Sequence, residues 1–274
     1  MAVSANAKSV GLIAGNGKFP LIFAQEAKRQ GYRVVAVAHR GETAEEIATV
    51  ADAITWIYVG QLGKIIRTFQ QAGVRQAVMA GGIRKVKLFG NFRPDLRGVS
   101  FLARMKSRED DALLRGIAGE LERDGIQVIE STFCLADIMP KVGALTSHEP
   151  TTAQRHDIEI GFAAAKEIGR LGIGQTVVVK DRVIVAVEAI EGTDAAILRG
   201  GSLAKGGCVV VKVSKPHQDL RFDVPAVGVE TIKSMAQAGA SVLAVEAEKT
   251  ILLEKEALLA EAQRAGIVVV AVSS

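Results

Sequence analysis

The sequence predicts an α/β protein of two domains with an aliphatic core. The chain has 274 residues, and at about 150 residues per domain this length favours two domains. Short apolar runs alternate with helical patterns through the first half, which is typical of a parallel sheet with crossover helices. Apolar residues make up 49% of the chain but aromatic residues only 4%, so alanine, valine, isoleucine and leucine must fill the core.

In the first half, proline and glycine mark where the expected helices begin and end. Pro20 suits the first turn of the first helix, Gly31 ends that helix, and Gly73 ends the third. The last helix begins with acidic residues, which suit the positive end of the helix dipole. We expect strands at 9–14, 33–38, 54–59, 75–80 and 126–129, and helices at 20–30, 44–51, 63–71 and 110–123. The basic segment before the last helix is expected to be irregular.

The second half predicts a mixed α/β domain, because a hairpin precedes alternating helices and strands. The expected strands are 176–179, 183–187, 208–213, 241–245 and 267–272, and the expected helices are 157–171, 229–238 and 253–265. Between the two halves lies a stretch without strong periodicity that contains Pro140 and Pro150. We therefore expect a Rossmann-like parallel-sheet domain at 1–137 and a mixed α/β domain at 138–274.

Composition excludes several classes of protein. The net charge of +4 is too mild to favour nucleic acid as a partner. The two cysteines, Cys134 and Cys208, rule out a disulfide framework and a cysteine-rich zinc site. No signal peptide is recognisable, and no apolar run reaches the roughly 18 to 20 residues that span a bilayer. We expect a cytoplasmic protein.

Two glycine turns are candidates for binding phosphate or a nucleotide. Gly15, Asn16 and Gly17 lie between a strand and a helix, whose N-terminus offers N–H groups to an anion. Gly81 and Gly82 follow the fourth strand and precede two basic residues. The third glycine of the dinucleotide fingerprint is absent and no acid ends the second strand, so a nicotinamide cofactor fits poorly. A glycine turn without any ligand is the alternative.

Residues 84–108 hold eight basic residues, one acidic residue and several large apolar ones. This mixture suits either a solvated surface or contact with anionic lipid at a membrane interface. Nucleic acid is less favoured, because the basic excess is local and no nucleic-acid motif is present.

Three carboxylates follow the second strand of the hairpin: Glu188, Glu191 and Asp194. Thr193 or Asp194 could cap the next helix, which explains one of these side chains but not all three. Mg²⁺ prefers oxygen ligands, and in proteins it often binds carboxylates and phosphates at the same time. A role in binding metal or substrate and a purely structural role therefore both stay open.

The segment 215–228 is the densest polar stretch of the chain and follows an expected strand. It contains Lys215, Arg221 and Asp223, and Pro225 stiffens the backbone near the aspartate. The four histidines lack zinc spacing, and no Gly-x-Ser-x-Gly elbow is present, so covalent nucleophilic catalysis is not expected. Asp223 could instead pair with Arg221 or cap a helix.

Several motifs together resemble a known family. They are Gly-Leu-Ile-Ala-Gly-Asn-Gly-x-x-Pro from Gly11, Asp-Asp-Ala-Leu-Leu-Arg from Asp110, Glu-Ile-Gly-Arg-Leu-Gly-Ile-Gly-Gln from Glu167, Val-Glu-Ala-x-Glu-Gly-Thr-Asp-Ala from Val187, and Lys-Pro-x-Gln-x-x-Arg-x-Asp-x-Pro from Lys215. The chain resembles, over almost its whole length, the UDP-2,3-diacylglucosamine pyrophosphatases of lipid A synthesis, in the two-domain class that is distinct from the calcineurin-like phosphoesterases.

The resemblance implies hydrolysis of UDP-2,3-diacylglucosamine to 2,3-diacylglucosamine 1-phosphate and UMP. It also implies Mg²⁺ or another divalent cation such as Mn²⁺, a lipid cleft between the domains, a homodimer, and peripheral contact with the inner membrane. Asp223 matches the family's essential aspartate, which would hold the metal or orient the water. The expected metal ligands are Asp223, Glu188 and Asp194. The expected substrate-binding residues are Gly15, Asn16, Gly17, Gly81, Gly82, Asp111, Gln175, Glu191, Gly192, Thr193, Asp194, Lys215 and Arg221.

Two other functions remain open from the residues alone. One is a nicotinamide-dependent oxidoreductase, which would have to bind NAD(H). The other is a non-catalytic module that binds a nucleotide sugar or a lipid and leaves it intact.

Overall fold

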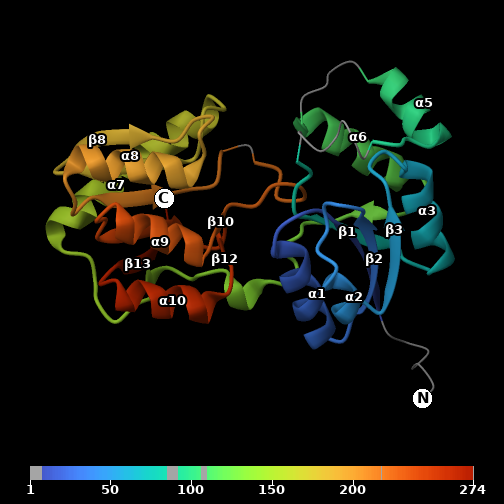
Figure 1. Ribbon diagram of the computed structural model, residues 1–274, viewed down its shortest axis with the longest axis horizontal. Coiled ribbons are helices and arrows are strands. Elements are labelled where there is room, and N and C mark those ends of the chain that lie inside the picture. Colours follow the sequence, from blue (N-terminus) through green and yellow to red (C-terminus); the bar gives the residue numbers. More distant parts are fainter. Residues whose placement is uncertain (1–7, 85–91, 106–109, 217, 274) are drawn as a thin grey trace. The chain divides into compact units, whose positions relative to one another are not determined.

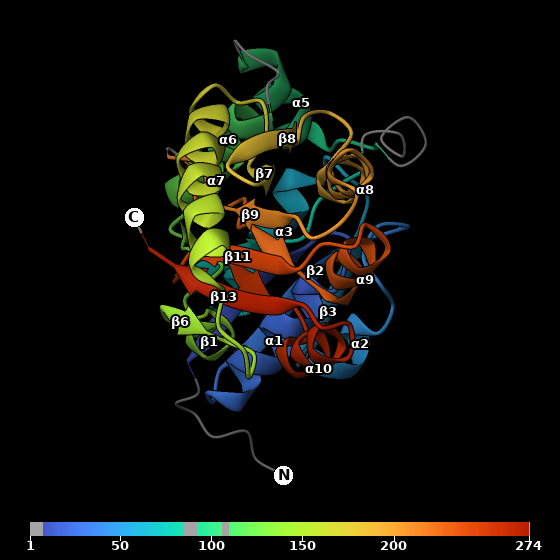
Figure 2. The ribbon, with the colours of Figure 1, turned by 90° about the vertical axis from the view of Figure 1, so that its left-hand side faces the viewer.

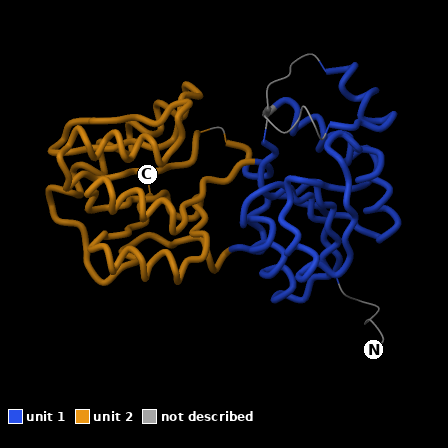
Figure 3. Tube along the Cα trace, in the orientation of Figure 1, with its two compact units in different colours: residues 1–135, 220–222 blue, residues 136–219, 223–274 orange. Residues whose placement is uncertain are grey.

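The computed structural model describes residues 8–84, 92–105, 110–216 and 218–273 (Figure 1). The chain divides into two compact units (Figure 3). Unit 1 consists of Met1–Leu135 with Leu220–Phe222, and unit 2 of Ala136–Asp219 with Asp223–Ser274. A short piece of the segment 215–228 thus belongs to unit 1, while the residues on either side of it belong to unit 2.

Unit 1 contains a five-stranded parallel sheet, which confirms the α/β class. Its strand order is β3-β2-β1-β4-β5. The strands are β1 (Ser9–Ala14), β2 (Arg33–His39), β3 (Ala53–Ile57), β4 (Gln76–Ala80) and β5 (Gln127–Val128). The helices are α1 (Phe19–Arg29), α2 (Ile47–Val50), α3 (Leu62–Gln71), α5 (Leu96–Arg104) and α6 (Asp110–Arg123). Pro20 is buried in the first turn of α1, as expected.

The order of the strands places the two glycine turns side by side. From β1 the chain continues through α1 to β2 on one side, whereas β4 lies on the other side of β1 and leads on to β5. The turns after β1 and β4 therefore meet at the carboxyl edge of neighbouring strands, where the strand order reverses. This switch point is where open α/β sheets commonly bind ligands.

Unit 2 contains a mixed six-stranded sheet of order β6-β13-β11-β9-β7-β8. The strands β9, β11 and β13 are parallel, and β7, β8 and β6 run antiparallel to their neighbours. The strands are β6 (Gly143–Ala144), β7 (Thr176–Lys180), β8 (Val183–Val187), β9 (Val209–Lys212), β11 (Val242–Glu246) and β13 (Val268–Val272), and β10 (Ala226–Val227) pairs separately with β12 (Ile251–Leu252).

Helices cover both faces of this sheet, as Figure 2 shows. On one face, α7 (Thr152–Arg170) packs Ile158 and Ala165 against Val177 and Val211. The opposite face carries α8 (Thr193–Ala204), α9 (Val229–Gln237) and α10 (Lys255–Arg264). Because successive residues of a strand point to opposite faces, the valine runs of β7 and β9 supply both cores.

The structure corrects several expected elements. Residues 96–104, expected to be irregular, form α5, whose first turn is capped by the Asp95 side chain accepting from the Gly98 N–H at 2.9 Å. Helix α7 begins five residues earlier than expected, because Thr151 and Gln154 form a capping box. Helix α2 is shorter than 44–51, since residues 44–46 form tight turns instead. Within the described residues, no helix is long and apolar enough to cross a membrane.

Candidate functional site

The glycine turns of unit 1 pack directly against each other. The Gly15 N–H donates to the Ala80 carbonyl, and the Asn16 N–H donates to the Gly82 carbonyl, both at 2.8 Å. A Cβ on Gly15 would lie 2.4 Å from the Gly82 oxygen, so only glycine fits there. The close packing of the turns explains these glycines, and it occupies the Gly15 and Asn16 N–H groups, whereas the N–H groups expected to bind an anion belong to the start of the following helix. Substrate binding by Gly15, Asn16, Gly17, Gly81 and Gly82 stays a prediction.

An acid that the sequence did not reveal lies beside these turns. The Glu42 side chain is fully buried, and its Oε2 accepts from Asn16 Nδ2 at 3.1 Å and from the Arg84 backbone N–H and Nε at 3.2 and 3.1 Å. Burial alone would raise the pKa of Glu42, but these hydrogen bonds outweigh it and the pKa is lowered. Glu42 thus fixes Asn16 and Arg84 at the switch point of unit 1.

In unit 2, five predicted residues gather at one edge of the sheet, around the end of β9. Thr193 Oγ1 donates to Glu188 Oε1 at 2.8 Å, and the Gln175 N–H donates to Glu188 Oε2 at 3.4 Å. A Cβ on Gly174 would lie 2.0 Å from the Glu188 carbonyl oxygen, so a glycine is required to bring these segments together. Asp194 and Asp223 complete the group, because both act electrostatically on the same lysine, Lys212.

Lys212 is the residue of this site that sequence reasoning missed. It is 6% exposed at the end of β9, and its ammonium donates to Thr193 Oγ1 at 3.1 Å. The pKa of Lys212 is lowered, because the effect of burial outweighs the opposing charges of Glu188, Asp194 and Asp223. A single charged residue in the apolar run 208–213 was the available signal, since a buried lysine needs anionic partners. We name Lys212 with Glu188, Thr193, Asp194 and Asp223 the carboxylate–lysine cluster.

Asp223 is exposed and lies in the segment that follows β9. Its Oδ2 accepts from Gln218 Nε2 at 2.7 Å, and its backbone N–H donates to the Asp219 carbonyl at 3.2 Å. The Lys215 N–H donates to Gln218 Oε1 at 2.8 Å. Arg221 belongs to unit 1, where it stacks on Phe222 and pairs with a glutamate of α6 at 3.5 Å. The alternative pairing of Arg221 with Asp223 is not among the described contacts.

The remaining predicted residues of the acidic stretch have structural partners. Gly192 is the N-cap of α8 and has a positive φ of 84°. Glu191 accepts from its own and the Ala189 backbone N–H groups and pairs with Arg199, and these contacts lower its pKa. The side chain of Asp111 lies outside what the structure describes. For Glu191, Gly192 and Asp111, substrate binding stays a prediction.

A buried ion-pair network supports the start of this polar segment. Glu246, at the end of β11 and 2% exposed, accepts from Lys166 Nζ at 2.6 Å, Lys249 Nζ at 2.8 Å and the Ser214 N–H at 2.8 Å. Burial alone would raise the pKa of Glu246, but these three donors outweigh it and the pKa is lowered. Through its hydrogen bond to Glu246, the Ser214 backbone is held against the end of β11.

We expect Glu246→Gln to lower the free energy of unfolding by about 2 kcal/mol at pH 7, because a charged acceptor of three hydrogen bonds is lost. Since the folded-state pKa lies below the ordinary value of 4.5, this contribution is present above pH 4.5 and disappears as the pH falls through the folded-state pKa. Urea unfolding of both proteins at pH 7 and in acid measures the difference. A difference that stays constant down to acidic pH would contradict the assignment.

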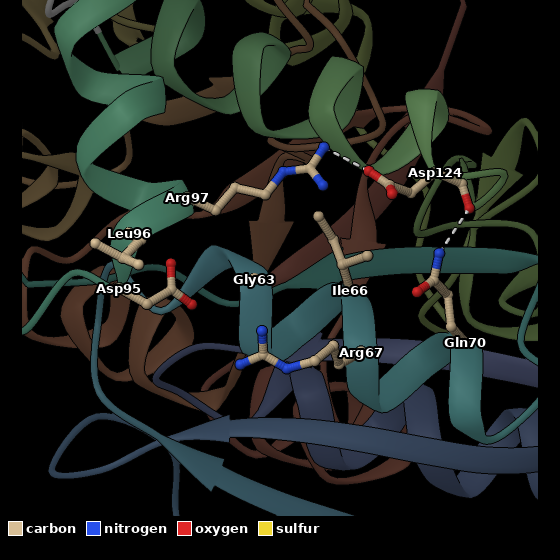
Figure 4. A pocket seen from close by; sticks show the side chains of 8 residues that line it. All are labelled: Gly63, Ile66, Arg67, Gln70, Asp95, Leu96, Arg97 and Asp124. Atoms are coloured by element: carbon tan, nitrogen blue, oxygen red, sulfur yellow. Dashed lines mark hydrogen bonds and ion pairs between the residues drawn. The ribbon is translucent and has the colours of Figure 1, made fainter.

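A described cavity lies elsewhere, in unit 1. It has a volume of about 380 Å³ and lies between α3, the start of α5 and the end of α6 (Figure 4). Its walls are formed by Gly63, Ile66, Arg67, Gln70, Asp95, Leu96, Arg97 and Asp124. None of the sequence-predicted site residues lines it, and Arg97 is held there by Asp124 and Glu120. We therefore centre the candidate site on the carboxylate–lysine cluster.

Comparison with known proteins identifies relatives over almost the whole chain. Residues 9–138 match the model of the LpxI N-terminal domain, and residues 141–270 match that of the LpxI C-terminal domain. The chain is 31% identical over 279 residues to the UDP-2,3-diacylglucosamine pyrophosphatase LpxI of Caulobacter vibrioides. The aligned region covers 97% of this chain and 98% of the relative.

Two solved structures resemble the chain only weakly. The biotin carboxylase subunit of pyruvate carboxylase gives a TM-score of 0.27 at 14% identity, and biotin carboxylase of Campylobacter jejuni gives 0.24 at 15% identity. In both cases the match covers 73% of this chain but only 42% of the other. At such scores the similarity indicates no shared function.

Proposed function

This chain belongs to the LpxI family of UDP-2,3-diacylglucosamine pyrophosphatases of lipid A synthesis, and from that premise we propose how it acts. It hydrolyses the pyrophosphate bond of its substrate with the aid of a divalent cation, and it releases 2,3-diacylglucosamine 1-phosphate and UMP. The observation that supports this best is the gathering of Gln175, Glu188, Thr193, Asp194 and Asp223 around Lys212 at one edge of the sheet of unit 2.

The chemistry of this cluster suits a phosphoryl transfer to water. Asp223 is exposed, so its carboxylate is accessible to water, and Gln218 fixes one of its oxygens. Lys212 provides a positive charge that the fold already holds in place. Such a fixed charge can stabilise the negative charge that develops on the phosphoryl oxygens in the transition state. The Gln175 side-chain oxygen is buried without a hydrogen-bond partner among the described residues, and it offers an acceptor to a substrate hydroxyl or amide.

Among the described residues, no three His, Cys, Asp or Glu side chains are arranged to hold a metal ion by themselves. A hard divalent cation such as Mg²⁺ or Mn²⁺ would therefore have fewer protein ligands and would depend on phosphate oxygens as well. All the acidic groups of the cluster offer oxygen, and three carboxylates against one ammonium leave two negative charges in excess. Both oxygens of Glu188 already accept hydrogen bonds, so the exposed Asp194 and Asp223 would hold the ion together with phosphate oxygens. A bound cation would polarise the phosphoryl oxygens and lower the pKa of water. Glu188 as a ligand stays a prediction.

We expect water to attack the sugar-side phosphorus, so that UMP is the leaving group. Hydrolysis in ¹⁸O-labelled water should then place the label in the phosphate of the sugar lipid and leave UMP unlabelled. Mass spectrometry of the two products after a single turnover distinguishes the possibilities. Label in UMP would show that the uridine-side phosphorus is attacked instead.

We further propose that α5 contacts the membrane surface that holds the substrate. The structure shifts this proposal from the cations of 84–108 to apolar side chains, because Arg97 and Arg104 are paired with Glu120. On α5, Leu96 and Val99 are 91% and 52% exposed, and Leu102 is 39% exposed one turn further along. Such an exposed apolar face next to basic side chains suits an anionic lipid interface. Residues 85–91 and 106–108 of the segment lie outside the described residues.

Leu96→Glu combined with Val99→Glu should weaken binding to anionic vesicles at least tenfold, because two apolar side chains can no longer enter the interface. Co-sedimentation with vesicles measures the effect. The matched control is Leu171→Glu, which changes a leucine of unit 2 that is 61% exposed. If the double variant and the wild type bind the vesicles equally well, the proposal is wrong and α5 is an ordinary solvated surface.

A cytoplasmic location and a homodimer are also proposed, on the resemblance to the family alone. Light scattering of the purified protein tests the oligomeric state.

A further inference from the structure

We propose that Gln218 is a positioning residue for Asp223. The role rests on the proposed function, in which Asp223 acts on water or holds the cation. Gln218 Nε2 donates to Asp223 Oδ2 at 2.7 Å. Among the described residues this is the one side-chain contact of the Asp223 carboxylate. Whatever fixes the direction of the Gln218 amide therefore also fixes the direction of the carboxylate.

The Gln218 amide can point in only one way. Its oxygen accepts from the Lys215 N–H at 2.8 Å and from Ser214 Oγ at 3.2 Å. Both groups serve here as donors, so the carbonyl side of the amide must face them and the NH₂ side must face Asp223. Turning the amide over would set N–H against N–H at Lys215 and oxygen against oxygen at Asp223. Three hydrogen bonds thus define one orientation.

The contacts of Gln218 are anchored in the core of unit 2. The Ser214 N–H donates to the buried Glu246 carboxylate at 2.8 Å, and the Ser214 carbonyl accepts from Lys166 Nζ at 2.8 Å. Glu246 ends β11, whose neighbour in the sheet is β9. A continuous path of hydrogen bonds therefore leads from the sheet through Ser214 and Gln218 to Asp223. Such support holds a functional group in its working geometry.

This path leaves Oδ1 of Asp223 as the oxygen available for chemistry. Oδ2 is directed at Gln218, so the carboxylate cannot rotate freely on its exposed segment. Lys212 on β9, Asp194 on α8 and Lys215 and Asp219 beside Gln218 provide the surrounding charge. When Oδ2 is fixed, Oδ1 meets the reacting groups at a defined angle. Correct orientation of reacting groups raises the rate of a reaction.

Two substitutions separate the positioning of Asp223 from the support of the segment. Gln218→Glu keeps an oxygen for Lys215 and Ser214 but removes the donor to Asp223, whereas Gln218→Leu removes all three hydrogen bonds. We expect both variants to lower kcat at least tenfold and to leave KM within about threefold, because Gln218 itself is not among the expected substrate-binding residues. Gln263→Leu, which changes an exposed glutamine of α10, is the matched control and should keep the wild-type kcat.

The decisive comparison places Gln218→Leu in a protein that already carries Asp223→Asn. Residues that act as a unit show non-additive effects on kcat, so Gln218→Leu should cost less than twofold there. Radiolabelled substrate makes the residual rates measurable, and thermal melting confirms that each variant is folded. The inference is overturned if both single variants keep kcat within twofold of the wild type, or if Gln218→Leu costs the same factor in both backgrounds. A wild type that does not hydrolyse the substrate would overturn the proposed function, and this inference with it.

Discussion

Asp223→Asn is expected to lower kcat by a factor of about 10³, which corresponds to roughly 4 kcal/mol of transition-state stabilisation. Asparagine has nearly the same shape and keeps an oxygen that can accept from Gln218 Nε2. It loses the negative charge that would hold the cation or orient the water. Because Asp223 is exposed and packs little, the melting temperature should stay close to that of the wild type. Steady-state kinetics and thermal melting on one preparation measure both quantities.

The matched control for this prediction is Asp181→Asn. Asp181 lies in the turn between β7 and β8, is exposed, and has a positive φ of 48° that asparagine tolerates. Asp181→Asn removes one negative charge from the same unit, as Asp223→Asn does, and should leave kcat unchanged. A folded Asp223→Asn protein with full activity would refute the catalytic role and favour a capping role for this carboxylate.

Lys212→Met is expected to lower the free energy of unfolding by about 4 kcal/mol, because it leaves the buried Glu188 carboxylate without its buried positive neighbour. Glu188 is 9% exposed and would lose the nearby ammonium, while Asp194 and Asp223 offer it no opposite charge. The Thr193 hydroxyl would also lose its donor. Urea unfolding followed by circular dichroism gives the change.

The control for Lys212 is a second substitution in the same cluster. Adding Glu188→Gln to Lys212→Met removes the buried charge that was left alone, so the double variant should recover a large part of the lost stability. Glutamine can still accept from Thr193 Oγ1 through its side-chain oxygen. If the two losses simply add, Lys212 and Glu188 do not act as a pair.

The elements of the fold were largely predictable because aliphatic runs and their glycine and proline boundaries are local signals. The strand at Ser9–Ala14 and the helix at Asp110–Arg123 have the expected bounds. Helix α5 was missed because only Gly98 and Phe101 are buried, while the apolar Leu96, Val99 and Leu102 are exposed, so its apolar residues do not all mark one core-facing side. The early start of α7 depends on the capping contact of Thr151, which periodicity does not report.

The candidate site was predictable where acidic residues stand out in the sequence and hidden where contacts cross the sheet. Glu188, Asp194 and Asp223 were predicted from their type and position, and they share the environment of Lys212. Lys212 and Glu42 were not predicted, because their partners come from strands and loops that are distant along the chain. Gln218 was part of a recognised motif, but only the direction of its hydrogen bonds suggests a role.

Phosphorus NMR of UDP-2,3-diacylglucosamine incubated with the protein and Mg²⁺ tests the central claim most directly. We predict that the two diphosphate signals disappear and that two monophosphate signals replace them, from UMP and the 1-phosphate of the sugar lipid. With EDTA in place of Mg²⁺, or with Asp223→Asn in place of the wild type, the diphosphate signals should persist. Diphosphate signals that remain unchanged with the folded wild type and Mg²⁺ would contradict the account and favour a protein that binds the substrate without cleaving it.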